Sequence, residues 1–103
     1  MGTTKTQIFT AEQNELAIIL KVLANPARIA ILQYISNQRA CICNDIVEEI
    51  GLAQPTISQH LKELKKAGLI QGTVDPPRVK YCINRENWEE AKRMFAAFFK
   101  VEQ

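Results

Sequence analysis

The sequence predicts a mostly α-helical domain that carries one small β-hairpin, with the hairpin placed just before the last helix. Three observations predict it. Apolar residues recur at three- and four-residue spacing, a proline or a capping residue precedes several of these stretches, and two short β-rich runs flank the turn Asp75-Pro76-Pro77. No repeat or linker divides the 103 residues, so we expect a single domain over residues 1–103.

The first two helices are predicted over Ala11–Leu23 and from Pro26 to about Ser36. Thr10 and Gln13 have the spacing of a capping box, in which each side chain bonds the backbone of the other. Asn25 can cap the second helix, and the proline after it stands where a missing N–H costs nothing. The first helix is apolar on more than one face, so a small domain needs a second surface to bury it.

A short third helix and a longer fourth helix follow. The third is predicted from Asp45 to Ile50, and Gly51 ends it. The fourth opens at Gln54-Pro55, with proline at the first helical position, and continues until Gly68. One face of the fourth helix carries apolar side chains at i, i+4 and i+7, namely Ile57, Leu61 and Leu64.

The chain then forms the hairpin and the last helix. The two strands are predicted over Leu69–Val74 and Val79–Ile83. Asn84 can cap the last helix. An apolar stripe with several aromatic rings runs along that helix and comprises Trp88, Ala91, Phe95, Phe98 and Phe99.

A helix, a Gly-Leu-Ala turn, a proline-initiated helix and a hairpin in this order form a winged helix-turn-helix, α-α-α-α-β-β-α. In that fold the second helix enters the major groove of DNA. The polar residues of the fourth helix suit such a role, because Gln can pair with adenine, Ser and Thr can contact bases or phosphate, and Lys neutralises phosphate. The candidate DNA-binding residues are Gln54, Thr56, Ser58, Gln59, His60 and Lys62, with Lys65 and Lys66 beyond them and Arg78 and Lys80 on the hairpin.

The distribution of charge favours the same interpretation. The whole chain carries a net charge of only +2, which alone indicates no polyanionic partner. Residues 54–80 carry a net +3, whereas residues 41–50 carry −3. An ordinary solvated helix face with mixed charges is the alternative reading of these lysines. The turn, the proline start and the hairpin together favour DNA binding over it.

The chain resembles the ArsR/SmtB family of bacterial winged-helix repressors from about Leu16 onward. The stretches LANPARIAILQYI and CICNDIVEEIGLAQPTISQHLKELKKAGLI and the hairpin end VKYCIN carry the resemblance. It implies a homodimeric repressor that binds a DNA operator, with the first and last helices at the dimer interface, and that leaves its operator when an inducer binds. The excess apolar surface on those helices assigns to this interface Ile18, Ile19, Val22, Trp88, Phe95, Phe98 and Phe99.

The three cysteines are candidate ligands for the inducer. The resemblance places Cys41 and Cys43 where thiolate sensors of the family hold soft ions, and thiolates select such ions. Trivalent arsenic or antimony, then cadmium, are the inducers expected, and no cofactor is required. A third Cys of the arsenic sensors is replaced here by Ile46, and Cys82 completes the site only if the hairpin approaches the third helix. A dithiol redox or persulfide switch, and simple packing of small apolar residues, remain open.

Other function classes lack their residues. The N-terminus has no apolar signal region, and the longest apolar run, Leu16–Leu20, is too short to span a bilayer, so we expect a cytoplasmic chain without membrane contact. His60 is the only histidine and no glycine-rich phosphate loop occurs, so no enzyme is expected. The alternative function is a winged-helix module that binds a protein through the aromatic face of its last helix.

Overall fold

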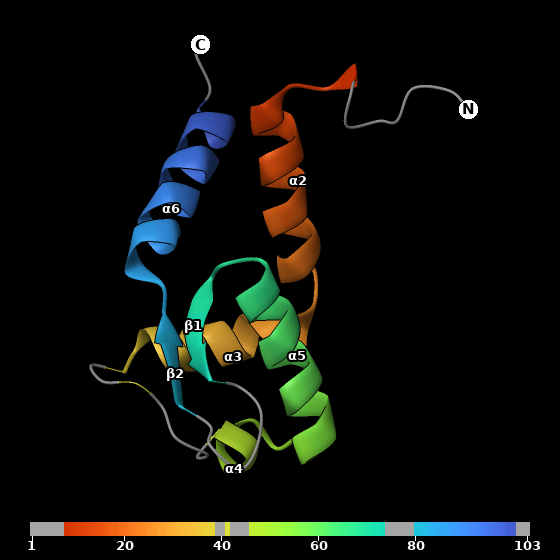
Figure 1. The fold of residues 1–103 in the computed structure, drawn as a ribbon, viewed down its shortest axis with the longest axis vertical. Coiled ribbons are helices and arrows are strands. Elements are labelled where there is room, and N and C mark those ends of the chain that lie inside the picture. The colour runs from red at the N-terminus through yellow and green to blue at the C-terminus, as the bar shows by residue number, and fades with distance from the viewer. Residues whose placement is uncertain (1–7, 39–40, 42–45, 74–79, 101–103) are drawn as a thin grey trace.

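The computed structural model describes residues 8–38, 41, 46–73 and 80–100. Their fold is a winged helix-turn-helix in two parts (Figure 1). The lower part holds three helices and a two-stranded antiparallel hairpin, namely α3 (Pro26–Ser36), α4 (Ile46–Ile50), α5 (Gln54–Lys66), β1 (Ile70–Thr73) and β2 (Lys80–Ile83). Above it stand α2 (Ala11–Leu23) and α6 (Arg85–Phe99), side by side.

The predicted caps of the first two helices are present. Thr10 Oγ1 accepts from the Gln13 backbone N–H at 3.0 Å, and Gln13 Oε1 accepts from the Thr10 N–H at 2.9 Å. Asn25 Oδ1 accepts from the backbone N–H groups of Ala27 and Arg28 at 2.9 and 3.3 Å. Each bond satisfies an N–H that has no partner inside its own helix, so both helices begin where the sequence predicts.

The start of α5 differs from the prediction by one residue. Ala53 is the N-cap and Gln54 the first helical residue, so Pro55 stands at the second position and not the first. No side chain caps this end, and the first four N–H groups of a helix have no partner within it, so proline is tolerated at either position. Gly51, with φ of +82°, turns the chain between α4 and α5.

The core lies between α5, α3 and the hairpin. Ile57, Leu61 and Leu64 are all at most 1% exposed, which confirms the predicted apolar face of α5. The other buried apolar residues come from every remaining element except α2, and they are Ile31, Leu32, Ile35, Ile46, Leu69, Ile70, Tyr81, Ile83 and Ala91. Since α2 contributes no fully buried residue, its apolar residues are left partly uncovered.

The hairpin pairs Ile70 with Ile83 and Gln71 with Cys82, and β1 begins one residue later than predicted. Leu69 lies outside β1 because its N–H donates to Leu64 O at 3.1 Å, as part of the end of α5. Residues 74–79, which include the predicted turn, lie outside the described part of the chain.

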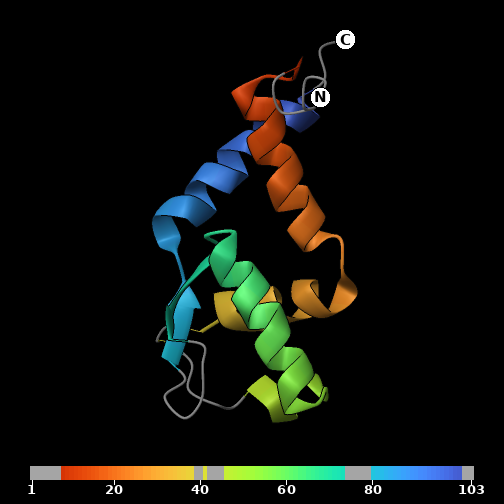
Figure 2. The same cartoon turned by 45° about the vertical axis from the view of Figure 1, so that its right-hand side comes forward.

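The last helix begins where the hairpin ends. Asn84 Oδ1 accepts from the Asn87 N–H at 3.1 Å, as the predicted cap requires, and Asn87 Nδ2 donates to Gly68 O at 2.9 Å. These bonds fix the base of α6 against the end of α5. In the turned view of Figure 2, α2 and α6 approach each other most closely where α2 begins and α6 ends.

Two glycines with positive φ allow a matched test of the hairpin. Gly51 and Gly72 have φ of +82° and +118°, a region that costs other residues about 1–2 kcal/mol. A Cβ on Gly51 would meet nothing within 4 Å, whereas a Cβ on Gly72 would clash with the Lys80 carbonyl oxygen and lie 2.9 Å from Tyr81 Cα. We predict that Gly72→Ala lowers the free energy of unfolding, measured by urea denaturation, clearly more than Gly51→Ala. Equal losses would contradict the tight strand pairing.

Candidate nucleic-acid interface

The polar side of α5 is turned to solvent. Figure 2 shows α5 crossing in front of α3, on the outside of the lower part of the molecule. Among the predicted contact residues, Gln54, Thr56, Gln59 and Lys62 are exposed, as are Lys65 and Lys66 nearer the end of the helix. Ser58 and His60 are half-buried. Both lie closer to the buried face than the other candidates do.

Two glutamines of this face are hydrogen-bonded along the helix. Gln54 Nε2 donates to Ser58 Oγ at 3.0 Å, and Gln59 Nε2 donates to Glu63 Oε1 at 3.3 Å. Both pairs have the i, i+4 spacing at which helix side chains meet. Each amide is held against the helix in the free protein, so binding a base edge requires it to exchange or share this bond.

His60 takes part in a contact between helices that the sequence does not indicate. Arg28 Nε of α3 donates to His60 Nδ1 at 3.0 Å, and Arg28 Nη1 donates to Val22 O, near the end of α2, at 3.4 Å. Burial and, second, the Arg28 charge lower the pKa of His60 below 6.5. His60 therefore stays neutral at pH 7 and accepts at Nδ1, which leaves Nε2 to carry the ring N–H. Arg28 thus connects α2, α3 and α5.

The hairpin has one basic residue among the described part of the chain. Lys80 begins β2, pairs in register with Thr73, and is exposed. Arg78, the other predicted hairpin contact, lies outside the described residues.

Two of the three cysteines are described, and the structure brings them together. Cys41 is exposed and Cys82 is half-buried. Both line a pocket of about 230 Å³ at the end of α3, beside the hairpin and the first residue of α6. A hydrogen bond with the Cys82 thiol is the main cause that raises the pKa of Cys41. Cys43 lies outside the described part of the chain. Among the described residues, no cluster of three or more His, Cys, Asp or Glu residues could hold a metal ion.

The predicted dimer residues divide into two groups. Ile18, Phe98 and Phe99 are 57%, 61% and 67% exposed. Ile19, Val22 and Trp88 are half-buried against the core, and Phe95 is also half-buried. The first group forms an apolar surface that this single chain leaves in water.

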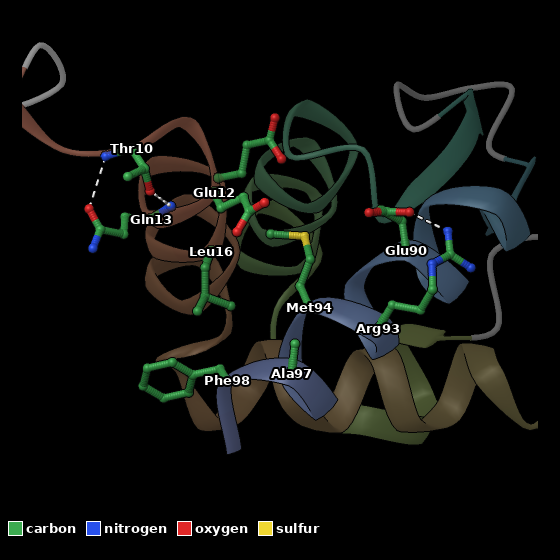
Figure 3. Close-up of a pocket in the computed structure, with 10 residues that line it drawn as sticks. Thr10, Glu12, Gln13, Leu16, Glu90, Arg93, Met94, Ala97 and Phe98 are labelled. Carbon is green, nitrogen blue, oxygen red and sulfur yellow. Dashed lines mark hydrogen bonds and ion pairs between the residues drawn. The ribbon is translucent and has the colours of Figure 1, made fainter. Parts of the chain in front are cut away.

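A pocket of about 640 Å³ lies between α2 and α6. Figure 3 shows Leu16 of α2 and Met94 of α6 in the space between the two helices, with Phe98 near the end of α6. An ion pair between Glu90 and Arg93 lies at the rim. Phe98 belongs both to this pocket and to the exposed apolar group, and the other walls of the pocket are mostly polar or charged.

Comparison with known proteins decides the family. The family described as "Bacterial regulatory protein, arsR family" matches residues 25–71, from the cap of α3 to β1. The "Arsenical resistance operon repressor" of Staphylococcus xylosus is 38% identical over 72 residues, which are 70% of this chain and 68% of that protein. The chain belongs to the arsR family of bacterial regulatory proteins.

Other relatives of this arsR-family chain match over a shorter stretch or by fold. The "HTH-type transcriptional repressor SmtB" of Mycobacterium tuberculosis is 41% identical over 54 residues, but these are only 52% of this chain and 39% of that protein. HlyU from Vibrio cholerae superposes with a TM-score of 0.66 at 20% identity, covering 88% of this chain and 98% of HlyU. That likeness shows the fold. The relatives from Staphylococcus xylosus and Mycobacterium tuberculosis are both named as repressors, which agrees with the expectation that the chain is not an enzyme.

Within the described ranges, the helices of this arsR-family chain are all too short or too polar to cross a bilayer.

The Arg28–His60 contact predicts how the stability of the fold depends on pH. Because the pKa of His60 is lowered in the folded state, its neutral form is favoured there, whereas the unfolded chain takes up a proton near 6.5. The stability that the neutral form supplies is complete above about pH 6.5 and is lost as the pH falls from 6.5 toward the folded pKa.

NMR titration of His60, the only histidine, measures this directly. We predict a midpoint below 6.5 that rises in Arg28→Gln without reaching 6.5, because burial remains. Arg85→Gln, at the start of α6, is the matched control and should leave the midpoint unchanged. A wild-type midpoint at or above 6.5 would contradict the contact.

Proposed function

We propose that this chain is a transcriptional repressor that binds an operator in double-stranded DNA through α5 and the hairpin. One observation carries the proposal: the polar, basic side of α5 is exposed while its opposite side is buried against α3 and the hairpin. A helix fixed from behind in this way can enter a major groove without losing its core contacts. The names of the relatives, two of them repressors, support the same function.

The order of residues along α5 suggests how contacts are shared. Gln54, Thr56 and Ser58 lie in its first turns, and the N-terminal part of a recognition helix is the part that meets base edges. Gln59, His60 and Lys62 follow. Lys65 and Lys66 lie in the last turn, where they suit phosphate contacts that add affinity without sequence preference. Lys80, with Arg78, would add backbone contacts from the hairpin.

The proposed repressor acts as a homodimer. The surface formed by Ile18, Phe98 and Phe99 is apolar and exposed, and burying it against a second copy removes it from water. The half-buried Ile19, Val22, Trp88 and Phe95 lie on the same two helices and would extend the contact. Two copies related by a two-fold axis place two α5 helices for an inverted-repeat operator.

The proposed inducer is a thiol-directed species. The name of the Staphylococcus xylosus relative refers to arsenical resistance, and thiolates prefer soft ions such as trivalent arsenic, antimony or cadmium. Cys41 and Cys43, with Cys82 beside Cys41, supply the thiols. The inducer releases the operator only if it binds the DNA-incompetent state more tightly than the competent one. A dithiol redox or persulfide switch at the same cysteines is the alternative signal.

Two substitutions on α5 distinguish contacts with base edges from contacts with phosphates. We predict that Gln59→Ala weakens binding to the cognate operator by about 1–3 kcal/mol and binding to random DNA little, because a base contact is lost. Lys62→Ala should weaken both about equally, because phosphates are present in every sequence. Fluorescence anisotropy at fixed salt measures both.

Lys92→Ala on α6 is the control, since Lys92 is exposed and paired with Glu89 at 3.3 Å, away from α5. It should change neither affinity. Equal losses on both DNAs for Gln59→Ala would remove Gln59 from the base-reading set.

Dimerisation is tested at Phe98. The side chain is 61% exposed in the single chain, so Phe98→Asp should leave the fold intact, but in a dimer it would bury a charge. We predict loss of the dimer and of tight operator binding together, measured by sedimentation at micromolar concentration and by anisotropy. Gln33→Asp, on the exposed side of α3, introduces the same charge and should retain the dimer. A monomeric wild-type protein would refute the homodimer.

A further inference from the structure

Cys41 and Cys82 are far apart in the sequence but share one pocket. Its walls come from the end of α3 through Ile35 and Gln38, from β1 through Gln71, and from the first residue of α6, Arg85. The pocket has a volume of about 230 Å³ and mixes polar and apolar walls. Two thiols from distant parts of the chain therefore line one space large enough for a small ligand.

The hairpin fixes the position of Cys82. Its neighbours Tyr81 and Ile83 are 0% and 4% exposed and point into the core. Because side chains alternate along a strand, the Cys82 side chain is directed to the other face of the hairpin. Its partner in register is Gln71, which also lines the pocket. Strand pairing thus holds the backbone of Cys82 in place.

The end of α3 lies beside the other thiol, because Ile35 and Gln38 line the same pocket as Cys41. Ile35 is 2% exposed and packs in the core, and Gln38 N–H donates to Ile35 O at 3.0 Å. Gln38 Nε2 donates to Tyr34 O at 3.2 Å, so the last turn of α3 is closed by its own side chain. Cys41 follows this end of α3, and the nearby Cys82 thiol raises the pKa of Cys41.

We propose that Cys41 and Cys82 form a two-thiol site that is bridged by a trivalent arsenical with two exchangeable positions on arsenic. In the reaction R–As=O binds both thiols, two As–S bonds form, and the arsenic-bound oxygen leaves as water with the two thiol protons. Arsenic stays trivalent, so no oxidant is needed. The pair that is bridged thus joins α3 to the hairpin and is not the adjacent Cys41-Cys43 pair that the sequence spacing suggests.

Placement of the thiols favours this pair. A second thiol already near the first acts at a high effective concentration, which strengthens two-point binding by on the order of 10²- to 10⁴-fold over one thiol. Less chain freedom is lost when two groups that already lie close together are bridged than when distant groups must first be brought together. Cys41 and Cys82 meet both conditions, because they line one pocket and Cys82 lies on the paired strand β2.

The regulatory consequence rests on the proposed repressor function. A bridge between Cys41 and Cys82 ties the segment that enters α4 to the strand that begins with Lys80. The bridge then adds a covalent cross-link between the hairpin and the chain that leads into the helix-turn-helix. If the DNA-bound arrangement needs them to move independently, bridging weakens operator binding by about 5- to 150-fold, the usual range of coupling between two sites.

Phenylarsine oxide, which offers two positions to thiols, tests the site on the full reduced chain without DNA. After one equivalent is bound, free thiols are alkylated and mapped by mass spectrometry. The proposal expects Cys41 and Cys82 to be protected and Cys43 to be alkylated. Protection of Cys41 and Cys43 with alkylation of Cys82 would overturn it, as would alkylation of all three.

Single serine variants give an independent readout of affinity. Cys43→Ser, the matched control, should bind phenylarsine oxide as the wild type does. Cys41→Ser and Cys82→Ser should each lose on the order of 10²- to 10⁴-fold in affinity. Thermal melts check folding, and Cys82→Ala, which keeps a small apolar side chain, replaces Cys82→Ser if that variant unfolds. Wild-type affinity in either Cys82 variant would overturn the site.

Operator binding and thiol mapping are measured independently of each other. Thiol mapping needs no DNA, so a chain that protects Cys41 and Cys82 but binds no operator would refute the proposed repressor and leave the site standing. A chain that binds its operator but fails the mapping would refute the site alone.

Discussion

The structure depends on the burial of one side of α5. Ile57, Leu61 and Leu64 are almost fully removed from water, and each such side chain contributes about 1.5–3 kcal/mol. Because successive residues of a helix turn by a fixed angle, burying these three fixes which residues point outward. Gln59 and Lys62 are exposed for that reason, and no separate interaction is needed to aim them. The candidate DNA-binding face is therefore a consequence of the core.

The remaining contacts join α5 to the parts that a signal or a partner chain would reach. Arg28 bonds His60 on one side and the Val22 carbonyl on the other, so α2 and α5 are connected through one side chain. Asn87 bonds Gly68 at the other end of α5 and connects it to α6. A change at the α2–α6 surface or at the cysteine pocket thus has short physical routes to α5.

Signals within a few residues of each other predict the helices, whereas such signals do not predict contacts between residues that are distant in the sequence. Thr10, Asn25 and Asn84 act within three residues of themselves, so the sequence alone located three helix starts. Leu69 was placed in a strand because its N–H bond to α5 has no local signature. The Arg28–His60 bond spans 32 positions, and the approach of Cys82 to Cys41 depends on how α3 packs on the hairpin. The spacing of apolar residues carries no information about such packing. The sequence therefore predicts Cys82 as part of the thiol site only on the condition that the hairpin approaches the third helix.

The central claim is that α5 and the hairpin bind duplex DNA, and the salt dependence of that binding tests it most directly. If several lysines contact phosphates, log K falls linearly with log salt, with a slope of about −0.9 for each phosphate neutralised. The account predicts a steep negative slope for the wild-type protein on its operator. An affinity that hardly changes with salt, or no binding to duplex DNA at all, would contradict it and would favour a module that binds a protein through its aromatic face.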